Sequence, residues 1–178
     1  MTYDSKTLED AALLQCVNMM CAAARTAPKT KGVDRIVTMA LTGKEKDDFA
    51  AELRKTGEQC NGASMIRDAG NIETAGALVL IGVKNTPSGL GATCRMCGFD
   101  DCAACTAAGA RCIFGAIDLG IATDSAAQTA AAMHVDNRIM FSAGRAALAL
   151  GLFGDDVSAA LGIPLSISGK SPFFDRKK

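Results

Sequence analysis

One short segment, residues 77–83, constrains the fold more than any other part of the chain. Its sequence, Ala-Leu-Val-Leu-Ile-Gly-Val, is apolar or small throughout, and it lies between Gly76 and the turn-forming run Asn85-Thr86-Pro87. A run of this length between turn signals, without polar alternation, is typical of a strand buried on both faces. The segment therefore predicts the centre of a sheet with other elements packed on each side.

Helical and strand patterns surround this central segment. Residues 33–41 are short and rich in Val, Ile and Met, which favours a second strand. Apolar residues recur at helical spacing elsewhere. The expected helices are 5–25, 44–55, 63–72, 113–134 and 137–150, with a further short helix at 155–161 before Gly162-Ile163-Pro164. Helix outweighs strand, and the pattern indicates an α+β domain.

Composition narrows the function classes. The chain has 178 residues, 19 basic and 19 acidic side chains and a net charge of zero, so no global charge attracts nucleic acid or an anionic membrane. It has no Trp and only one Tyr, which leaves few surfaces for stacking bases or sugars. The acidic start and the lack of a long uncharged apolar stretch predict a cytoplasmic protein without a membrane span.

The cysteines carry the strongest chemical signal. Eight are present, and in a reducing compartment they are not expected to form structural disulfides. Five follow the spacing Cys94-x2-Cys97-x4-Cys102-x2-Cys105, with Cys112 seven residues further on. Zinc sites usually separate their cysteine pairs by about 12–20 residues, whereas iron–sulfur ligands occur in compact runs. The spacing therefore favours an iron–sulfur cluster over zinc or unligated thiols.

The spacing leaves open which cysteine is the fourth ligand. Gly98 allows the chain to turn back after the first pair, and Gly109 allows a short helix to end before Cys112. Cys105 and Cys112 both remain candidates at this point. The isolated Cys16, Cys21 and Cys60 are interpreted as small buried hydrophobic residues.

Four segments together resemble the uncharacterised prokaryotic family described as ferredoxin-domain-containing proteins. They are Cys94-Arg-Met-Cys97-Gly-Phe-Asp-Asp-Cys102, Cys112-Ile-Phe-Gly-Ala-Ile-Asp118-Leu-Gly120-Ile-Ala, Val135-Asp136-Asn137-Arg138-Ile-Met-Phe and Gly162-Ile-Pro-Leu-Ser-Ile-Ser-Gly169-Lys170. The resemblance implies a cluster held by Cys94, Cys97, Cys102 and Cys112, with Cys105 as an additional cysteine. We expect a 4Fe–4S cluster rather than a 2Fe–2S cluster.

A second resemblance concerns the frame around the cysteines. The helix ending Ala23-Ala24-Arg25-Thr26-Ala27-Pro28, the later Leu148-Ala-Leu-Gly151-Leu and the segment Leu161-Gly-Ile-Pro164 look like the flavin-dependent nitroreductase fold. That fold implies an intertwined homodimer with FMN at the subunit interface. The chain lacks that family's N-terminal Arg-Arg-Ser-x-Arg phosphate clamp. The candidate flavin-binding residues are therefore Arg25, Pro28, Lys29, Lys31, Lys170 and Arg176.

These observations predict one nitroreductase-like domain over residues 1–178, a central sheet flanked by helices, with an iron–sulfur module inserted at 86–112. The expected function is electron transfer between the cluster and a bound flavin. This function does not decide whether the protein is also an enzyme. An electron carrier without flavin, and a non-catalytic interaction protein with a structural zinc site, are the alternatives. The long apolar helices predict a homodimer. The expected redox partner is another protein, and neither nucleic acid nor membrane.

Overall fold

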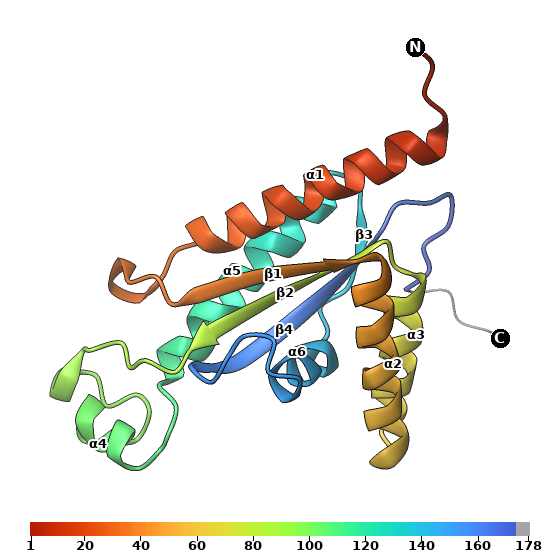
Figure 1. Ribbon diagram of the computed structural model, residues 1–178. Helices are drawn as coiled ribbons and strands as arrows, with labels where there is room; N and C mark the ends of the chain where they lie inside the picture. The colour runs from red at the N-terminus through yellow and green to blue at the C-terminus, as the bar shows by residue number, and fades with distance from the viewer. Residues whose placement is uncertain (174–178) are drawn as a thin grey trace.

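The computed structural model describes residues 1–173, which form a four-stranded antiparallel sheet with helices on both faces (Figure 1). The strand order is β1-β2-β4-β3. The strands are β1 (Ile36–Thr42), β2 (Ala77–Lys84), β3 (Asp136–Asn137) and β4 (Val157–Ser166). The α-helices are α1 (Ser5–Thr26), α2 (Gly43–Gln59), α3 (Ala63–Thr74), α4 (Cys102–Ala107), α5 (Ile113–Ala132) and α6 (Phe141–Ala149). Two single 3-10 turns are η1 (Thr30–Gly32) and η2 (Gly91–Thr93).

Strand β2 is central, as its apolar sequence predicts. It pairs with β1 on one side and with β4 on the other. Its alternate side chains point to opposite faces, so Val79 and Ile81 join the core under α1 and α5, while Leu78 and Leu80 join the core under α2, α3 and α6. The two cores explain why this strand has no polar alternation.

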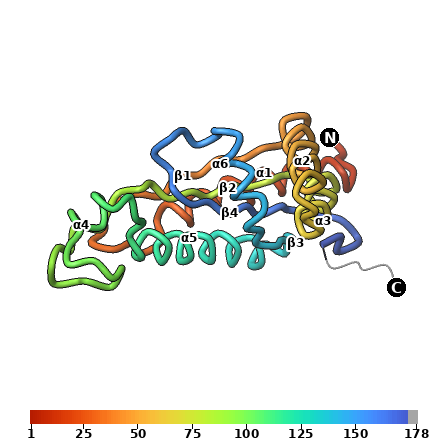
Figure 2. The backbone as a smooth tube through the Cα atoms, turned by 90° about the horizontal axis from the view of Figure 1, so that it is seen from below, coloured from red at the N-terminus to blue at the C-terminus, as the bar shows by residue number. Residues whose placement is uncertain are grey.

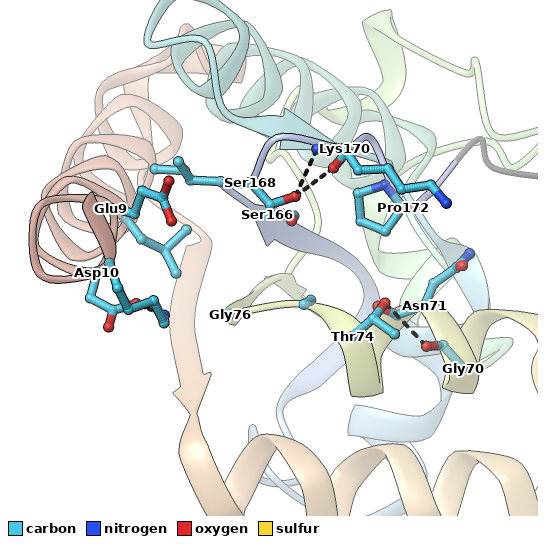
Figure 3. Close-up of a pocket in the computed structure, with 14 residues that line it drawn as sticks. Glu9, Asp10, Gly70, Asn71, Thr74, Gly76, Ser166, Ser168, Lys170 and Pro172 are labelled. Carbon is cyan, nitrogen blue, oxygen red and sulfur yellow. Dashed lines mark hydrogen bonds and ion pairs between the residues drawn. The ribbon is translucent and has the colours of Figure 1, made fainter. Parts of the chain in front are cut away.

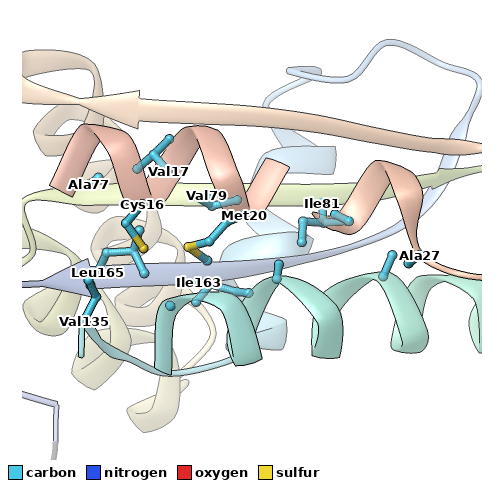
Figure 4. Close-up of a cluster of buried hydrophobic side chains, with 14 of the residues drawn as sticks. Cys16, Val17, Met20, Ala27, Ala77, Val79, Ile81, Val135, Ile163 and Leu165 are labelled. Carbon is cyan, nitrogen blue, oxygen red and sulfur yellow. The ribbon is translucent and has the colours of Figure 1, made fainter. Parts of the chain in front are cut away.

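The face covered by α1 and α5 is built from close helix contacts. Cys16, Val17 and Met20 of α1 belong to this core, and Cys16 and Met20 point toward β4 (Figure 4). In α5, Ala122 and Ala126 are fully buried, and their small side chains let that helix lie close to the sheet and to α1. Across residues 1–173, none of the helices combines the length and apolar character needed to cross a membrane.

The opposite face carries α2, α3 and α6. Phe49 and Leu53 of α2 pack there with Ile72 of α3. Helix α6 lies directly against β4 at Gly144, where an added Cβ would stand 1.8 Å from the carbonyl oxygen of Ala160. Only a glycine permits this separation of helix and strand.

The predicted helix at 155–161 is wrong, because this segment is the first half of β4. Gly162-Ile163-Pro164 looks like a break, but Gly162 exchanges both backbone hydrogen bonds with Met140 on the side away from β2. Backbone N–H directions alternate along a strand, so the nitrogen of Pro164 also faces away from β2. Pro164 therefore removes no hydrogen bond from the β2–β4 ladder.

Other boundaries shift by a few residues. The helix expected at 137–150 begins at Phe141, because Asp136–Asn137 pairs with the end of β4. The strand expected from residue 33 begins at Ile36. The cysteine-rich segment leaves the end of β2, projects beyond the sheet and returns at the start of α5, as both views show (Figures 1 and 2).

Candidate functional site

The cysteine module, residues 86–112, is shaped by two glycines and one helix cap. Gly98 has φ +84° and its N–H donates to the carbonyl of Arg95 at 3.0 Å, which turns the chain after Cys97. Asp101 caps α4 by accepting from the N–H of Ala104 at 2.8 Å. Gly109, with φ +65°, follows the end of α4 and directs the chain back toward α5. The turn at Gly98 and the helix end near Gly109 are as the sequence predicts.

The module brings cysteines from different positions together. Cys94, Cys97, Cys102 and Cys112 are half-buried, while Cys105 is only 1% exposed. Burial raises the pKa of the Cys105 thiol, and hydrogen bonding to Cys97 together with the nearby Cys112 and Cys102 raises it further. Cys105, interpreted from the sequence as an additional cysteine, thus lies among three of the four expected ligands.

Cys112 has a different environment, because it precedes the first turn of α5. Burial raises the pKa of its thiol, but the nearby backbone amides of Ser88, Phe114 and Gly115 outweigh burial, so the pKa lies below its ordinary value. These donors stabilise the thiolate, which is the form of cysteine that binds metal. The donor set of the module therefore fits a thiolate-bound cluster. Within residues 1–173, no three Cys, His, Asp or Glu side chains are placed to hold a single metal ion.

The remaining cysteines lie outside the module. Cys16 is fully buried in the core beneath α1, and Cys21 is half-buried. Cys60 is exposed at the end of α2, so its interpretation as a buried residue is wrong. Because the apolar pattern of α2 ends before Cys60, the Cys60 side chain does not face the core.

The candidate flavin residues at the end of α1 have partners within the chain. Arg25 pairs with Asp34, and Lys29 donates to the carbonyl oxygens of Arg25 and Ala27. Lysine at this position interacts favourably with the negative end of the helix dipole. Lys31 donates to the carbonyl of Gly89 at 3.2 Å and so contacts the cysteine module.

Pro28 lies beside Arg25 and Lys29 in an open cavity of about 510 Å³. Lys170 lies elsewhere, in a cavity of about 660 Å³ at the other end of α1 (Figure 3). Since an α-helix rises 1.5 Å per residue, Lys6 beside this cavity and Arg25 are about 28 Å apart. Within one chain, the structure therefore does not bring Lys170 together with the other candidate flavin residues at the end of α1. Arg176 lies outside the described residues.

The Lys170 cavity is lined by three separate parts of the fold. Its walls come from the first turns of α1, from the end of α3 with the residues before β2, and from the segment after β4. Asn71 points into this region from α3 (Figure 3), and its Nδ2 is buried with no hydrogen-bond partner in the described part of the chain. No local sequence signal marks Asn71, because its role depends on segments far apart in the sequence.

No local sequence signal indicates a buried network that lies where the cysteine module joins the rest of the fold. Arg35, directly before β1, forms an ion pair with Asp118 of α5, with 2.6 Å between Nη2 and Oδ2. Both side chains are almost fully buried. Thr30 donates to the same carboxylate through its N–H and its hydroxyl. Sequence spacing cannot indicate these partners of Asp118, because they lie more than 80 residues away in the sequence.

Two comparisons with known sequences agree. A family model described as an uncharacterised protein containing a ferredoxin domain matches residues 108–176. An uncharacterised protein from Archaeoglobus fulgidus is 40% identical over 166 residues, which cover 89% of this chain and 88% of that protein. The chain belongs to this family of ferredoxin-domain proteins. The family-model match includes Cys112 and α5 but begins after Cys105, whereas the archaeal relative matches over most of the chain.

Solved structures similar to this ferredoxin-domain protein include nitroreductases. A nitroreductase with bound FMN from Desulfitobacterium hafniense has a TM-score of 0.60 at 14% identity, covering 96% of this chain and 81% of that one. A putative nitroreductase in complex with FMN from Desulfovibrio desulfuricans has a TM-score of 0.58 at 12% identity, covering 92% and 79%. The protein therefore has the nitroreductase fold, as expected from its sequence.

Proposed function

We propose that this ferredoxin-domain protein is a redox protein whose cysteine module holds an iron–sulfur cluster and whose fold binds a flavin. The observation that carries the proposal is the gathering of Cys97, Cys102 and Cys112 around the buried Cys105 in one projecting module. A bound iron–sulfur cluster supplies one-electron oxidation and reduction. The protein itself contributes the thiolates, the amide donors around Cys112 and a fixed position at the end of the sheet.

The proposed ligands are Cys94, Cys97, Cys102 and Cys112. The first three lie between the end of β2 and the end of α4, and Cys112 lies on the returning segment at the start of α5. Ligands from both segments would enclose a cluster from two sides. Cys105 packs inward from α4 as a small buried side chain.

The test is anaerobic reconstitution of the full chain with iron and sulfide, followed by metal and sulfide analysis and an absorption spectrum. Broad absorbance near about 400 nm with bound iron and sulfide supports the proposal. A colourless protein that takes up stoichiometric zinc and no iron would overturn it in favour of a structural zinc site.

For the flavin, we propose the Lys170 cavity rather than the end of α1. Its volume of about 660 Å³ lies in the range of about 300–1,000 Å³ that is usual for small-molecule sites. Lys170 offers positive charge for a phosphate, whereas Lys6 on the same wall already pairs with Asp10. The buried amide of Asn71 offers a donor that has no partner in residues 1–173. The bound FMN in the nitroreductase from Desulfitobacterium hafniense supports the choice of flavin.

Two charge reversals test this location. We expect Lys170→Glu to weaken FMN binding at least about tenfold, or about 1.4 kcal/mol, because repulsion replaces attraction to the phosphate. Lys29→Glu is the matched control and should leave the dissociation constant unchanged, since Lys29 bonds to carbonyls at the other end of α1. Fluorescence titration with FMN measures both. If only Lys29→Glu lost affinity for FMN, the phosphate site would lie at the end of α1 and not in the Lys170 cavity.

A further inference from the structure

The cysteine module is attached to the fold by two segments, and one buried network contacts both. The outgoing segment leaves β2 at Lys84, and the returning segment becomes α5 at Ile113. Arg35 donates through Nη1 to the carbonyl of Thr86 in the outgoing segment at 2.9 Å. The same guanidinium donates through Nη2 to Asp118 in α5. One side chain therefore joins the two segments that carry the cysteines.

The turn η1 makes a second connection of the same kind. Thr30 donates to Asp118 through its backbone N–H at 3.0 Å and through its hydroxyl at 2.9 Å. Its neighbour Lys31 donates to Gly89 in the outgoing segment. Lys31 has φ +58°, a conformation that non-glycine residues rarely adopt, and this turn places the two residues toward different segments.

The network is not needed to bury apolar surface. Arg35 is 3% exposed and Asp118 1% exposed, beside a core that already fills the space between α1, α5 and the sheet. In the described part of the chain, Nε of Arg35 is buried without a hydrogen-bond partner. Hydrophobic residues of similar volume often replace such a buried pair without loss of stability. What a hydrophobic pair could not supply is the set of directional bonds to Thr86 and Thr30.

We infer that Arg35 and Asp118 are positioning residues that hold the two segments of the cysteine module at a fixed separation. This inference rests on the proposed function, because Cys94, Cys97 and Cys102 belong to one segment and Cys112 to the other. Asp118 lies less than two helical turns after Cys112, so holding its carboxylate also fixes the start of α5. The network thereby sets where Cys112 stands relative to the other three ligands.

The test replaces the ion pair by apolar residues, Arg35→Met with Asp118→Leu, so that no buried charge is left unpaired. The matched control is Asp68→Leu with Ser142→Ala, on the other face of the sheet. It removes the buried bond from the Ser142 hydroxyl to Asp68, between α6 and α3, and the ion pair of Asp68 with the exposed Arg67. Thr30→Val, which removes only the hydroxyl bond to Asp118, is a milder variant in case the double variant does not fold.

Iron release and the electron paramagnetic resonance spectrum of the reduced cluster are measured on each reconstituted variant. In the reconstituted protein, we expect iron release to a chelator to be at least about tenfold faster in the Arg35/Asp118 variant than in the wild type and in the control, as for other residues that support metal ligands. Thr30→Val should release iron at an intermediate rate, with broader electron paramagnetic resonance lines of the reduced cluster. Equal release rates and unchanged line shapes in all variants would overturn the inference.

Hydrogen exchange on the metal-free protein separates this inference from the proposed function. We expect faster exchange of the amides in 86–93 and 110–115 in the Arg35/Asp118 variant, and no such change in the Asp68/Ser142 control. If the wild type binds no iron, the proposed function fails, and exchange alone then tests the connection between the two segments. If the wild type binds iron but the Arg35/Asp118 variant shows the same hydrogen exchange and iron release, the positioning role is rejected, while the proposed iron–sulfur cluster is still supported.

Discussion

At the scale of single residues, Cys105 and Cys112 present opposite environments for the same functional group. Burial raises the pKa of the Cys105 thiol, whereas the amides at the start of α5 help to lower the pKa of the Cys112 thiol. We expect Cys112→Ala to lose or convert the cluster, because one ligand from the returning segment disappears. Cys105→Ala should retain iron content and spectrum, with a modest loss of stability from the small cavity. Iron analysis and absorption spectra of both variants check this, and the reverse result would make Cys105 the fourth ligand.

The sequence allowed only part of this site to be predicted. The cysteine spacing, Gly98 and Gly109 are local signals, and they correctly indicated a compact turn followed by a short helix. The partners of Asp118 and Lys31 are not local, because each bond joins segments that meet only in the folded chain. The sequence suggests Lys31 as a flavin-binding residue, because a basic side chain near a helix end can bind a phosphate. In the structure, Lys31 donates to the carbonyl of Gly89 and so contacts the cysteine module.

At the scale of helices and strands, the packing of α6 against β4 depends on Gly144. An added Cβ at Gly144 would overlap the backbone of Ala160, which cannot move without disturbing the central sheet. We expect Gly144→Ala to lower stability by about 2–3 kcal/mol and the melting temperature by about 5–10 °C.

Gly120 provides the matched control for this prediction. It is an exposed helical glycine in α5 with no atom within 4 Å of an added Cβ. Gly120→Ala should raise stability by about 0.5–1 kcal/mol, because alanine favours the helical backbone. Thermal and denaturant unfolding measure both variants. Equal stability of the two would show that α6 can move away from β4.

Secondary structure was predictable where one strand or helix carries its own pattern. The apolar run of β2 and the periodic pattern of α1 led to elements with nearly the expected bounds. Strand β4 was missed because Gly162 and Pro164 normally interrupt regular structure. Only the pairing with β2 and the direction of the Pro164 nitrogen show why both residues are tolerated there.

At the scale of the whole molecule, α5 presents a row of apolar side chains to solvent. Ile113, Ile117 and Ile121 follow one another at helical spacing and are each 38–39% exposed. We propose that a second copy covers this row, so the chain is expected to have twice its mass of 18.3 kDa in light scattering at micromolar concentration. Ile117→Asp should shift the protein toward the monomer, because a charge would then be buried between subunits.

Leu150→Asp is the control for this prediction. Leu150 is 44% exposed and lies at the end of α6, on the other face of the sheet. This variant should keep the mass of the dimer. A wild-type protein with the mass of one chain would contradict the prediction, and dissociation by Leu150→Asp alone would place the contact on the face of α6.

The module's two attachment points lie close together at one end of the sheet. Asn85 and Thr86 on the outgoing side line the same small cavity as Arg111 and Cys112 on the returning side. A short turn could therefore join β2 directly to α5 without moving either element, since none of the core residues of the sheet lies in the segment between them. In evolutionary terms, a chain of this architecture could acquire or lose its cysteine module in a single insertion or deletion while both hydrophobic cores stay unchanged.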